Sequence, residues 1–408
     1  MAAIVLRNHQ RPNYHHVTRN LLLRMFSSPS QSPSPSPSSD TTTTPYRLAK
    51  SSIRKESADA EKIAEIFLKS SNHPRSYRDR SFFHISVQKL AKLKRFDLVE
   101  QILEHQRNTN LLKTEGFWIR IIMLYSEAGM LDQAIRTFDQ LEQKSEKSFC
   151  ALLSACLENR RFDLIHQYFE SVPSNTGLSP GIVAHNLVMR AFCAEKSFDS
   201  ARALLKKMET HKGLKPDVAS YNVLLTAYLR NRQEDKFDEL YKDFTKKGLE
   251  PNLVTYNARI TRLVKNKECV RAKKILDEMI SKGVKPNVNS FNTIIEGFCK
   301  IADFDSAKAI FDKMRSEDDF VSPNSDSYVT LITHLVQEGE FESALDMCKA
   351  SLEKKWVPPF SSMKGLVNGL VKHSKVNEAK EIVENMKKYL RGSAPDNWAK
   401  IEGLLPLQ

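Results

Sequence analysis

Residues 253–287 read LVTYNARITRLVKNKECVRAKKILDEMISKGVKPN, and this stretch decides the fold. In its first half, apolar residues such as Tyr256 and Ile260 recur at the spacing of one face of an α-helix, and the second half repeats this spacing around Leu276. A short polar segment separates the two halves. Gly283, followed by a proline, closes the second helix in the usual order for a helix C-terminus. The stretch therefore predicts two helices joined as a hairpin.

The hairpin is one copy of a repeat. A histidine or aromatic residue followed by asparagine recurs at intervals of 36, 35 and 35 residues, and prolines recur at intervals of 36, 35, 35, 37 and 35. These positions are His185-Asn186, Tyr221-Asn222, Tyr256-Asn257 and Phe291-Asn292, and Pro180, Pro216, Pro251, Pro286, Pro323 and Pro358. The clearest copies span residues 182–217, 218–252, 253–287, 288–324, 325–359 and 360–396. Such a period indicates stacked repeats, in which neighbouring hairpins bury each other's apolar faces.

This unit resembles the pentatricopeptide repeat, the helical hairpin of organellar RNA-binding proteins. The likeness rests on Tyr-Asn at the fourth and fifth positions and on Lys-Pro followed by Asn or Asp at the end of the unit. The related tetratricopeptide repeat, of about 34 residues, fits less well because its Trp-Leu-Gly-Tyr pattern is missing. The resemblance implies an all-α fold, a right-handed superhelical solenoid of about nine to ten hairpins over residues 58–396. Within this family the chain resembles the P class.

The N-terminal region has the composition of a targeting segment. Residues 1–39 contain no Asp or Glu but carry Arg7, Arg11, Arg19 and Arg24 among leucines and hydroxyl residues. This predicts a mitochondrial presequence over residues 1–26, with processing near Ser27 and a location in the matrix; a chloroplast transit peptide is the alternative. Its leucine run is far too short to span a bilayer, so no membrane partner is expected. Residues 27–57, rich in Ser, Pro and Thr, are expected to be a disordered linker.

The chain outside residues 182–324 keeps the period but loses the signature. We expect an unpaired second helix over residues 58–70 that caps the array, degenerate hairpins from about residue 80, and a tail over residues 397–408 that seals the last apolar face. At the positions that would read a base, these outer units carry Ile119, Cys150, Val329, Pro359 and Lys364. They are therefore expected not to read bases.

The charge of the chain favours an anionic partner. It carries 62 Lys and Arg against 49 Asp and Glu, a formal net charge of +13. Residues 1–26 hold four arginines and no Lys, Asp or Glu, so +13 less four leaves +9 on the remainder. A surplus of this size attracts polyanions but does not identify one.

The sequence offers no catalytic or metal-binding motif. Its six cysteines lack C-x-x-C spacing and histidines at ligand spacing, so we expect buried thiols, no metal and no cofactor. Relatives that edit cytidines carry a deaminase domain with H-x-E and P-C-x-x-C motifs, and relatives that cut RNA carry a nuclease domain; neither pattern occurs here. Walker, G-x-G-x-x-G and G-x-S-x-G motifs are also missing. An enzyme and a small-molecule substrate are therefore not expected.

The resemblance implies recognition of single-stranded RNA, one base for each hairpin. In the family, the fifth and last residues of a unit contact the base edge, and the second residues of adjacent units sandwich the base. The matching base-reading pairs are Asn186 with Asp217, Asn222 with Asn252, Asn257 with Asn287, and Asn292 with Asn324. The matching sandwiching residues are Val183, Ala219, Val254 and Asn289. The first pair resembles the uracil reader and the others a less selective pyrimidine reader, which implies a tract of four pyrimidines that begins with uracil.

The phosphates of such an RNA need partners of their own. Position thirteen is basic in four units, at Arg230, Lys265, Lys300 and Lys372. Because this position lies near the end of the first helix, the four side chains are expected to form one basic stripe that binds phosphates without sequence preference and in a salt-sensitive way. For each charge, a solvated helix end remains the alternative. For the asparagines, the alternative is a scaffold surface that does not read bases.

The chain as a whole also resembles a small group of short plant pentatricopeptide proteins of the small subunit of the mitochondrial ribosome. The shared segments are LAKLKRFDLVEQILEHQ (residues 90–106), EGF-x-x-R-I-I-x-L-Y (residues 115–125) and VNGLVKHSKVNEAKEIV (residues 367–383). Four readable units select about four bases, too few to identify one transcript but enough to hold a ribosomal RNA that neighbouring proteins position. We therefore expect a structural protein that binds mitochondrial rRNA and small-subunit proteins in translation. The alternatives are a factor for the stability, splicing or translation of one transcript, and a solenoid that binds protein alone.

Overall fold

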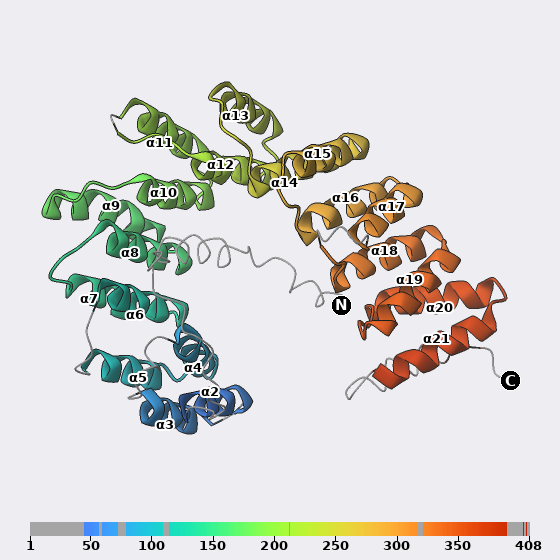
Figure 1. Ribbon diagram of the computed structural model, residues 1–408, viewed down its shortest axis with the longest axis horizontal. Coiled ribbons are helices and arrows are strands. Elements are labelled where there is room, and N and C mark those ends of the chain that lie inside the picture. The colour runs from blue at the N-terminus through green and yellow to red at the C-terminus, as the bar shows by residue number, and fades with distance from the viewer. Residues whose placement is uncertain are drawn as a thin grey trace, which may run out of the picture. The chain divides into compact units, whose positions relative to one another are not determined.

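The computed structural model describes residues 45–56, 59–71, 79–108, 114–211, 213–315, 321–389, 403 and 405. Over these residues the chain forms twenty α-helices and no strand (Figure 1). The expected all-α array of helical hairpins is confirmed, and the right hand of its superhelix stays a prediction. The expected presequence, residues 27–44 and 57 of the expected linker and most of the expected C-terminal tail lie outside the described residues.

The chain divides into two compact units, residues 1–224 and 225–408, and each is described by itself. Helices of the first unit are α2 (Pro45–Lys55), α3 (Ala60–Ser71), α4 (Arg80–Lys92), α5 (Phe96–Asn108), α6 (Glu115–Glu127), α7 (Leu131–Asp139), α8 (Glu146–Glu158), α9 (Phe162–Thr176), α10 (Ile182–Ala194) and α11 (Phe198–Thr210). Helix α12 (Val218–Arg230) contains the boundary. Helices of the second unit are α13 (Glu234–Lys246), α14 (Leu253–Lys265), α15 (Cys269–Ser281), α16 (Val288–Lys300), α17 (Phe304–Arg315), α18 (Ser325–Glu338), α19 (Phe341–Glu353), α20 (Phe360–Lys372) and α21 (Val376–Tyr389).

Helix α2 corrects the expected linker, which is wrong for residues 45–55. Ala49 and Ile53, one helical turn apart, are both buried, and α2 packs against α3 and α4. Helix α3 therefore has a partner, and the expectation of an unpaired capping helix over residues 58–70 is also wrong. The twenty described helices form ten hairpins, the upper end of the expected range.

The helices of each hairpin from α4/α5 to α20/α21 are joined by the same kind of turn. If the first residue of the hairpin's first helix is counted as one, the fifteenth residue of the hairpin has a positive φ of 56° to 84°. These residues are Lys94, Gly129, Arg160, Lys196, Arg232, Lys267, Ala302, Gly339 and Ser374. The next N–H then bonds to a carbonyl five residues earlier, as Glu268 N does to Leu263 O at 2.9 Å. This pattern is the Schellman motif, which satisfies carbonyl groups at the end of the first helix.

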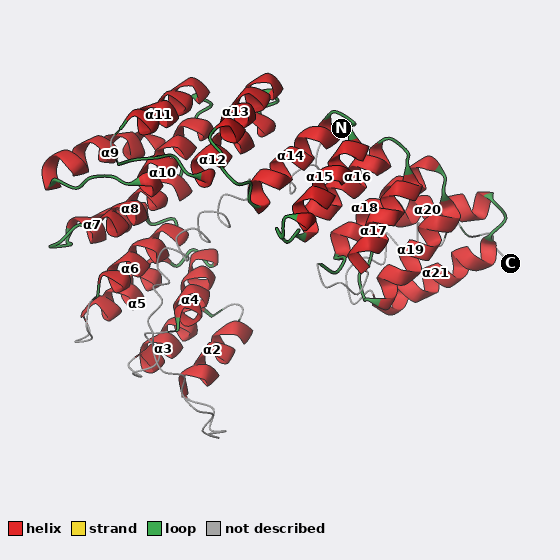
Figure 2. Ribbon diagram, turned by 45° about the horizontal axis from the view of Figure 1, so that its top comes forward, coloured by secondary structure: helices red, strands yellow, loops and turns green. Residues whose placement is uncertain are grey.

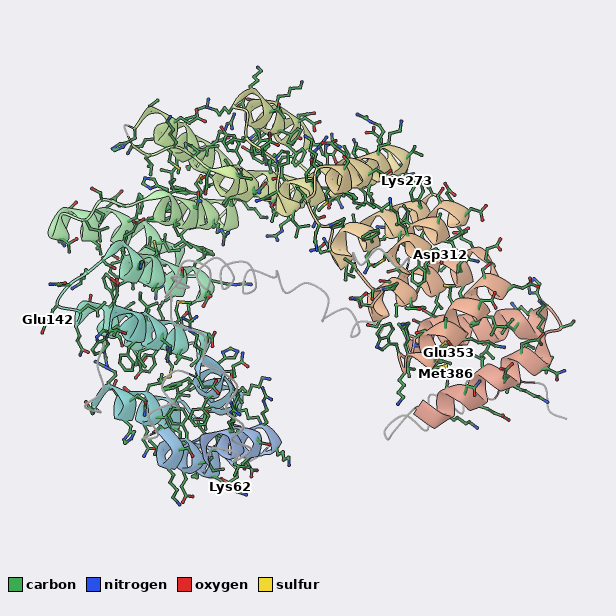
Figure 3. The ribbon with its side chains drawn as sticks, viewed as in Figure 1. Lys62, Glu142, Lys273, Asp312, Glu353 and Met386 are labelled. Carbon is green, nitrogen blue, oxygen red and sulfur yellow. The ribbon has the colours of Figure 1, made fainter. Side chains whose placement is uncertain are left out.

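The first helices form one layer in the second unit and the second helices form another. Helices α14, α16, α18 and α20 contact one another in sequence order, and each packs on the second helix of its own hairpin (Figure 2). Between the layers lies a continuous apolar core that includes Phe291, Leu331 and Met363. Exposed charges such as Lys273 on α15 and Asp312 on α17 cover the second helices (Figure 3). Leu405, from the expected C-terminal tail, packs against the core.

A glycine at the tenth position of α16 and of α20 lets each of these helices approach the preceding hairpin closely. A Cβ on Gly297 would lie 2.8 Å from Val264 Cγ1, and one on Gly369 would lie 2.1 Å from the ring of Phe341. Helix α14 differs, because its tenth residue is Arg262. That guanidinium pairs with Glu234 and Asp238 of α13, both at 2.9 Å, so ion pairs hold α13 to α14 where α16 and α20 use a glycine contact.

Candidate nucleic-acid interface

The last residue of a unit caps the first helix of the next unit. Asn252, Asn287 and Asn324 have extended backbones at the N-termini of α14, α16 and α18, and each belongs to a capping box. The Asn287 side-chain oxygen, for example, accepts the Ser290 N–H at 3.0 Å. Asp217 does the same for α12, since its Oδ1 accepts the Ser220 N–H at 2.8 Å. Half of the predicted base-reading residues therefore also stabilise a helix N-terminus.

Two of the predicted base-reading pairs are in direct contact. Asn257 Nδ2 donates to Asn287 Oδ1 at 3.4 Å, a long bond, and Asn292 Nδ2 donates to Asn324 Oδ1 at 3.3 Å. In each case the fifth residue of a unit on one first helix meets the cap of the next first helix. The residues that the family resemblance selected from spacing alone thus lie side by side in these two units.

Two serines complete these pairs, and the sequence reasoning missed them. The Ser290 hydroxyl donates to Asn257 Oδ1 at 2.6 Å, and the Ser327 hydroxyl donates to Asn292 Oδ1 at 2.7 Å. Both serines are buried third residues of a first helix. Their signal in the sequence is the spacing Asn-x-x-Ser at the start of a helix, which is a capping-box pattern.

The other two fifth-position asparagines are more deeply placed. Asn186 and Asn222 are each 7% exposed, whereas Asn257 and Asn292 are half-buried. Ser220 donates its hydroxyl to Asp217 Oδ1 at 2.9 Å, and Asn186 Oδ1 is left without a hydrogen-bond partner. A buried acceptor without a donor raises the free energy of the folded state, so an N–H donated by a ligand would be stabilising at this position.

The predicted sandwiching residues lie on the first turns of their helices. Val254 is 46% exposed and Asn289 is exposed, while Val183 and Ala219 are half-buried. Val254 also donates its N–H to Asn252 Oδ1 at 3.0 Å, which places its side chain next to a predicted base-reading residue. An exposed valine beside a polar pair provides an apolar surface on which a base could stack, and the role of these four residues stays a prediction.

The predicted basic stripe consists of exposed side chains at the ends of the first helices, and Lys265 and Lys300 are among those with partners within the protein. Lys265 Nζ donates to the Leu229 carbonyl at the end of α12, and burial lowers the pKa of this lysine. Lys300 pairs with Glu296 one turn earlier at 2.5 Å. An exposed pair of this kind contributes only about 0.3–0.5 kcal/mol, so a phosphate could replace Glu296 at small cost. Arg230 and Lys372 are exposed.

The early hairpins are built differently at the same places. Ile119 and Cys150 are buried, and the thirteenth positions are Glu127 and Glu158. Glu127 pairs with His84 at 2.5 Å and Glu158 accepts the Ser126 hydroxyl at 3.0 Å. A carboxylate where later units have a lysine opposes a phosphate, in keeping with the expectation that these units do not read RNA.

The first helices of the early hairpins also use acidic residues near their caps. Glu146 Oε1 accepts the Gly181 N–H at 3.0 Å, at the start of α10, and Glu115 accepts the hydroxyl of Ser145, the cap of α8. Glutamate thus reaches the next cap in these hairpins, where asparagine does so in the later ones. A negative charge is favourable at a helix N-terminus.

Five of the six cysteines, all of which lie in the described ranges, are buried. Burial raises the pKa of Cys150, Cys156, Cys299 and Cys348 to about 12, which keeps these sulfurs protonated and unreactive. No group of three or more His, Cys, Asp or Glu in the described part of the chain could hold a metal ion. None of the helices described is both long and apolar enough to cross a membrane.

Family models match this chain over more than half of its length. A model described as the PPR repeat family matches residues 251–300 and 286–337, and one described as the pentatricopeptide repeat domain matches residues 203–266. A third, described as the PPR repeat, matches residues 117–145, 183–212, 326–355 and 361–389.

Similar proteins carry related names. A mitochondrial pentatricopeptide repeat-containing protein of Arabidopsis thaliana is 41% identical over 87% of this chain and 88% of its own. The small ribosomal subunit protein mL103 (rPPR7) of Arabidopsis thaliana is 30% identical over 88% of this chain and 87% of its own. The crystal structure of maize PPR10 in complex with an 18-nt psaJ RNA element is 15% identical, covers 88% of this chain and 63% of its own, and has a TM-score of 0.42.

Proposed function

This chain belongs to the pentatricopeptide repeat family, and we propose that it is an RNA-binding protein of the mitochondrial matrix without enzymatic activity. We propose further that it is a structural component of the small subunit of the mitochondrial ribosome, where it binds rRNA and neighbouring small-subunit proteins during translation. The observation that carries this proposal is the likeness to a small ribosomal subunit protein across 88% of this chain and 87% of the relative. Such a likeness spans the whole array of hairpins and not one shared repeat.

The contacts at the starts of α14 to α18 support the RNA-binding part of the proposal. Two asparagine pairs at the starts of successive first helices, and an exposed Val254 on the first turn of α14, support the arrangement that the family uses for single bases. Asn186 with Asp217 is proposed to take uracil, and the remaining pairs are proposed to take pyrimidines. Four bases carry little information, so we assign the interface to an rRNA segment whose position is set by other contacts.

Sedimentation of the protein in a mitochondrial lysate tests the proposal. The protein should migrate with small ribosomal subunits, and treatment with ribonuclease should release it. Migration with free transcripts, or a position at the top of the gradient before treatment, would contradict the ribosomal assignment. A complex that survives both ribonuclease and high salt would instead indicate a solenoid that binds protein alone.

A factor for one mitochondrial transcript is the second candidate, and the repeated asparagine pairs favour it, because a scaffold needs no base-reading groups. Replacing Asn222 and Asn257 with Thr should shift the preference of two nucleotides from pyrimidine towards purine. If these substitutions abolish function while association with ribosomes is unchanged, the transcript-specific factor replaces the ribosomal proposal.

A further inference from the structure

We propose that Ser290 and Ser327 are positioning residues for base selection, because their hydroxyl groups hold the asparagine amides of the preceding unit in one orientation. This inference rests on the proposed binding of RNA and goes beyond it. The family resemblance selected only the fifth, last and second residues of each unit. The structure adds the third residue of the following unit as a part of the same hydrogen-bonded group.

The orientation of each amide follows from one backbone group that can only donate. The Ser290 N–H lies 3.0 Å from Asn287 Oδ1, so the oxygen of that amide must face it. Asn257 approaches the same oxygen at 3.4 Å and must therefore present its Nδ2 there. Its own oxygen is then left facing Ser290.

The Ser290 hydroxyl fills that remaining place. Its oxygen accepts the Asn287 N–H at 3.1 Å, and its proton points to Asn257 Oδ1 at 2.6 Å, the shorter of its two possible contacts. Ser290 is only 1% exposed, so water does not compete for this bond. If the Asn257 amide rotated by half a turn, oxygen would face oxygen at Asn287, and the hydroxyl would lose the shorter of its two acceptor contacts.

The same geometry occurs one unit later with different residues. Ser327 N donates to Asn324 Oδ1 at 3.0 Å, Asn292 Nδ2 donates to Asn324 Oδ1 at 3.3 Å, and the Ser327 hydroxyl reaches Asn292 Oδ1 at 2.7 Å. Because the serine–asparagine contact occurs twice with matching distances, it is not explained as the accidental contact of one side chain.

The Asn186 site shows what happens when the third residue does not make this bond. Ser220 caps α12 with the same backbone contacts, but its hydroxyl donates to Asp217 Oδ1 at 2.9 Å. Asn186 Oδ1 has no hydrogen-bond partner. The third-position serines of α12, α16 and α18 therefore all take part in the cap of their helix, but such a serine orients the preceding asparagine only where that asparagine's oxygen lies within its reach.

A fixed amide matters because pyrimidines and purines differ in the position and pattern of donors and acceptors on the edge that an asparagine contacts. An amide that can rotate adapts to more than one pattern, whereas one held by the serine offers its second Nδ2 hydrogen and the free lone pair of its oxygen in a fixed order. The serine thus makes the asparagine of the preceding unit selective between bases, although the serine itself does not contact the RNA.

The test uses the full chain and short single-stranded RNAs in which each position of a four-nucleotide pyrimidine tract is changed in turn. Binding is measured by fluorescence anisotropy. Ser290→Ala should reduce the discrimination between bases by about tenfold at the third nucleotide only, since that factor corresponds to one lost base contact of ordinary strength. Ser327→Ala should do the same at the fourth nucleotide. Ser290→Thr should keep the selectivity, because Thr255 makes the same capping contacts at the start of α14.

A matched control separates positioning from capping. Ser148→Ala removes a capping hydroxyl from α8, where it donates to the Ser145 carbonyl and to no base-reading residue, so it should lower thermal stability as Ser290→Ala does but leave base selectivity unchanged. If Ser290→Ala does not fold, Ser290→Cys replaces it in the same binding measurement, because cysteine is of similar size and its thiol is only a weak hydrogen-bond donor.

The outcomes distinguish this inference from the proposed function. Loss of selectivity confined to the third nucleotide supports the inference. Equal stability loss in Ser290→Ala and Ser148→Ala, with selectivity unchanged in both, overturns it and leaves RNA binding in place. A wild-type chain that binds RNA without base preference also overturns it, and a wild-type chain that binds no RNA overturns the proposed function as well.

Discussion

Replacing Gly369 with Ala should destabilise the C-terminal hairpins, although the substitution favours a helix. Gly369 lies inside α20, where Ala is more favourable than Gly by about 1 kcal/mol. The added Cβ, however, would lie 2.1 to 2.3 Å from three ring atoms of Phe341, the first residue of α19. That separation is far below a van der Waals contact, so either the ring or the helix must move.

The size of the effect follows from these opposing contributions. Overpacking a closely packed site costs about 1–3 kcal/mol, and the short distances to a rigid ring put this case at the upper end. Subtracting the gain in helix propensity leaves a net loss of about 1–2 kcal/mol. The assay is urea unfolding followed by circular dichroism, with the loss expected in the transition of the C-terminal repeats.

Two further variants make the reasoning refutable. Gly116→Ala, in α6, is the matched control, because its Cβ would meet nothing closer than Thr114 Oγ1 at 4.0 Å, and it should be neutral or stabilising. In a Phe341→Ala background the ring is gone, so Gly369→Ala should become stabilising by about 1 kcal/mol. The steric argument fails if Gly369→Ala alone is as stable as the wild type, or if its effect has the same sign in both backgrounds.

Three other predictions concern import, RNA binding and pH. A reporter fused to residues 1–45 should enter mitochondria, and exchange of the four presequence arginines for Glu should stop it; accumulation in chloroplasts would contradict this. Replacing Lys265 and Lys300 with Ala should weaken binding to all RNAs and lower the slope of log affinity against log salt by about one to two units, without changing base preference. Burial lowers the pKa of His185 below its ordinary 6.5, so the chain should lose stability as the pH falls below about 6.5, and unfolding at pH 5 and 7.5 should differ less in His185→Tyr than in the wild type.

The starts of the first helices could be predicted from the sequence. The expected units begin at residues 182, 218, 253, 288, 325 and 360, and helices α10, α12, α14, α16, α18 and α20 begin at those residues. The agreement has a local cause: a proline followed by a capping residue stops one helix and starts the next within a few positions. Such signals act over one turn of chain and need no knowledge of the rest of the fold.

Helix α2 could not be predicted in the same way. Its sequence, PYRLAKSSIRK, contains few apolar residues and follows a tract rich in Ser, Pro and Thr. What makes it a helix of the array is the burial of Ala49 and Ile53 against neighbouring helices, which is a tertiary effect. The same limit applies to Lys265, whose partner is the Leu229 carbonyl of the preceding hairpin and has no signature in the sequence.

The base-reading positions show a mixed result. Their identity came from the family resemblance, and the structure brings Asn257 to Asn287 and Asn292 to Asn324. The serine that joins each group was visible as a capping residue but not as a partner of the asparagine. That second contact depends on how closely one first helix packs on the next, which spacing along the chain does not reveal.

The turn inside each hairpin from α4/α5 to α20/α21 is a place where one substitution can change the backbone strain of that hairpin. These nine turns bend through the left-handed region, yet only Gly129 and Gly339 are glycines, so seven side chains occupy a conformation that L-residues disfavour by roughly 1–2 kcal/mol. Exchanging Lys267 or Arg232 for Gly would relieve that strain at one turn and leave the predicted RNA-reading positions untouched. Each hairpin that lacks such a glycine can therefore be stabilised separately, by one glycine substitution at its own turn.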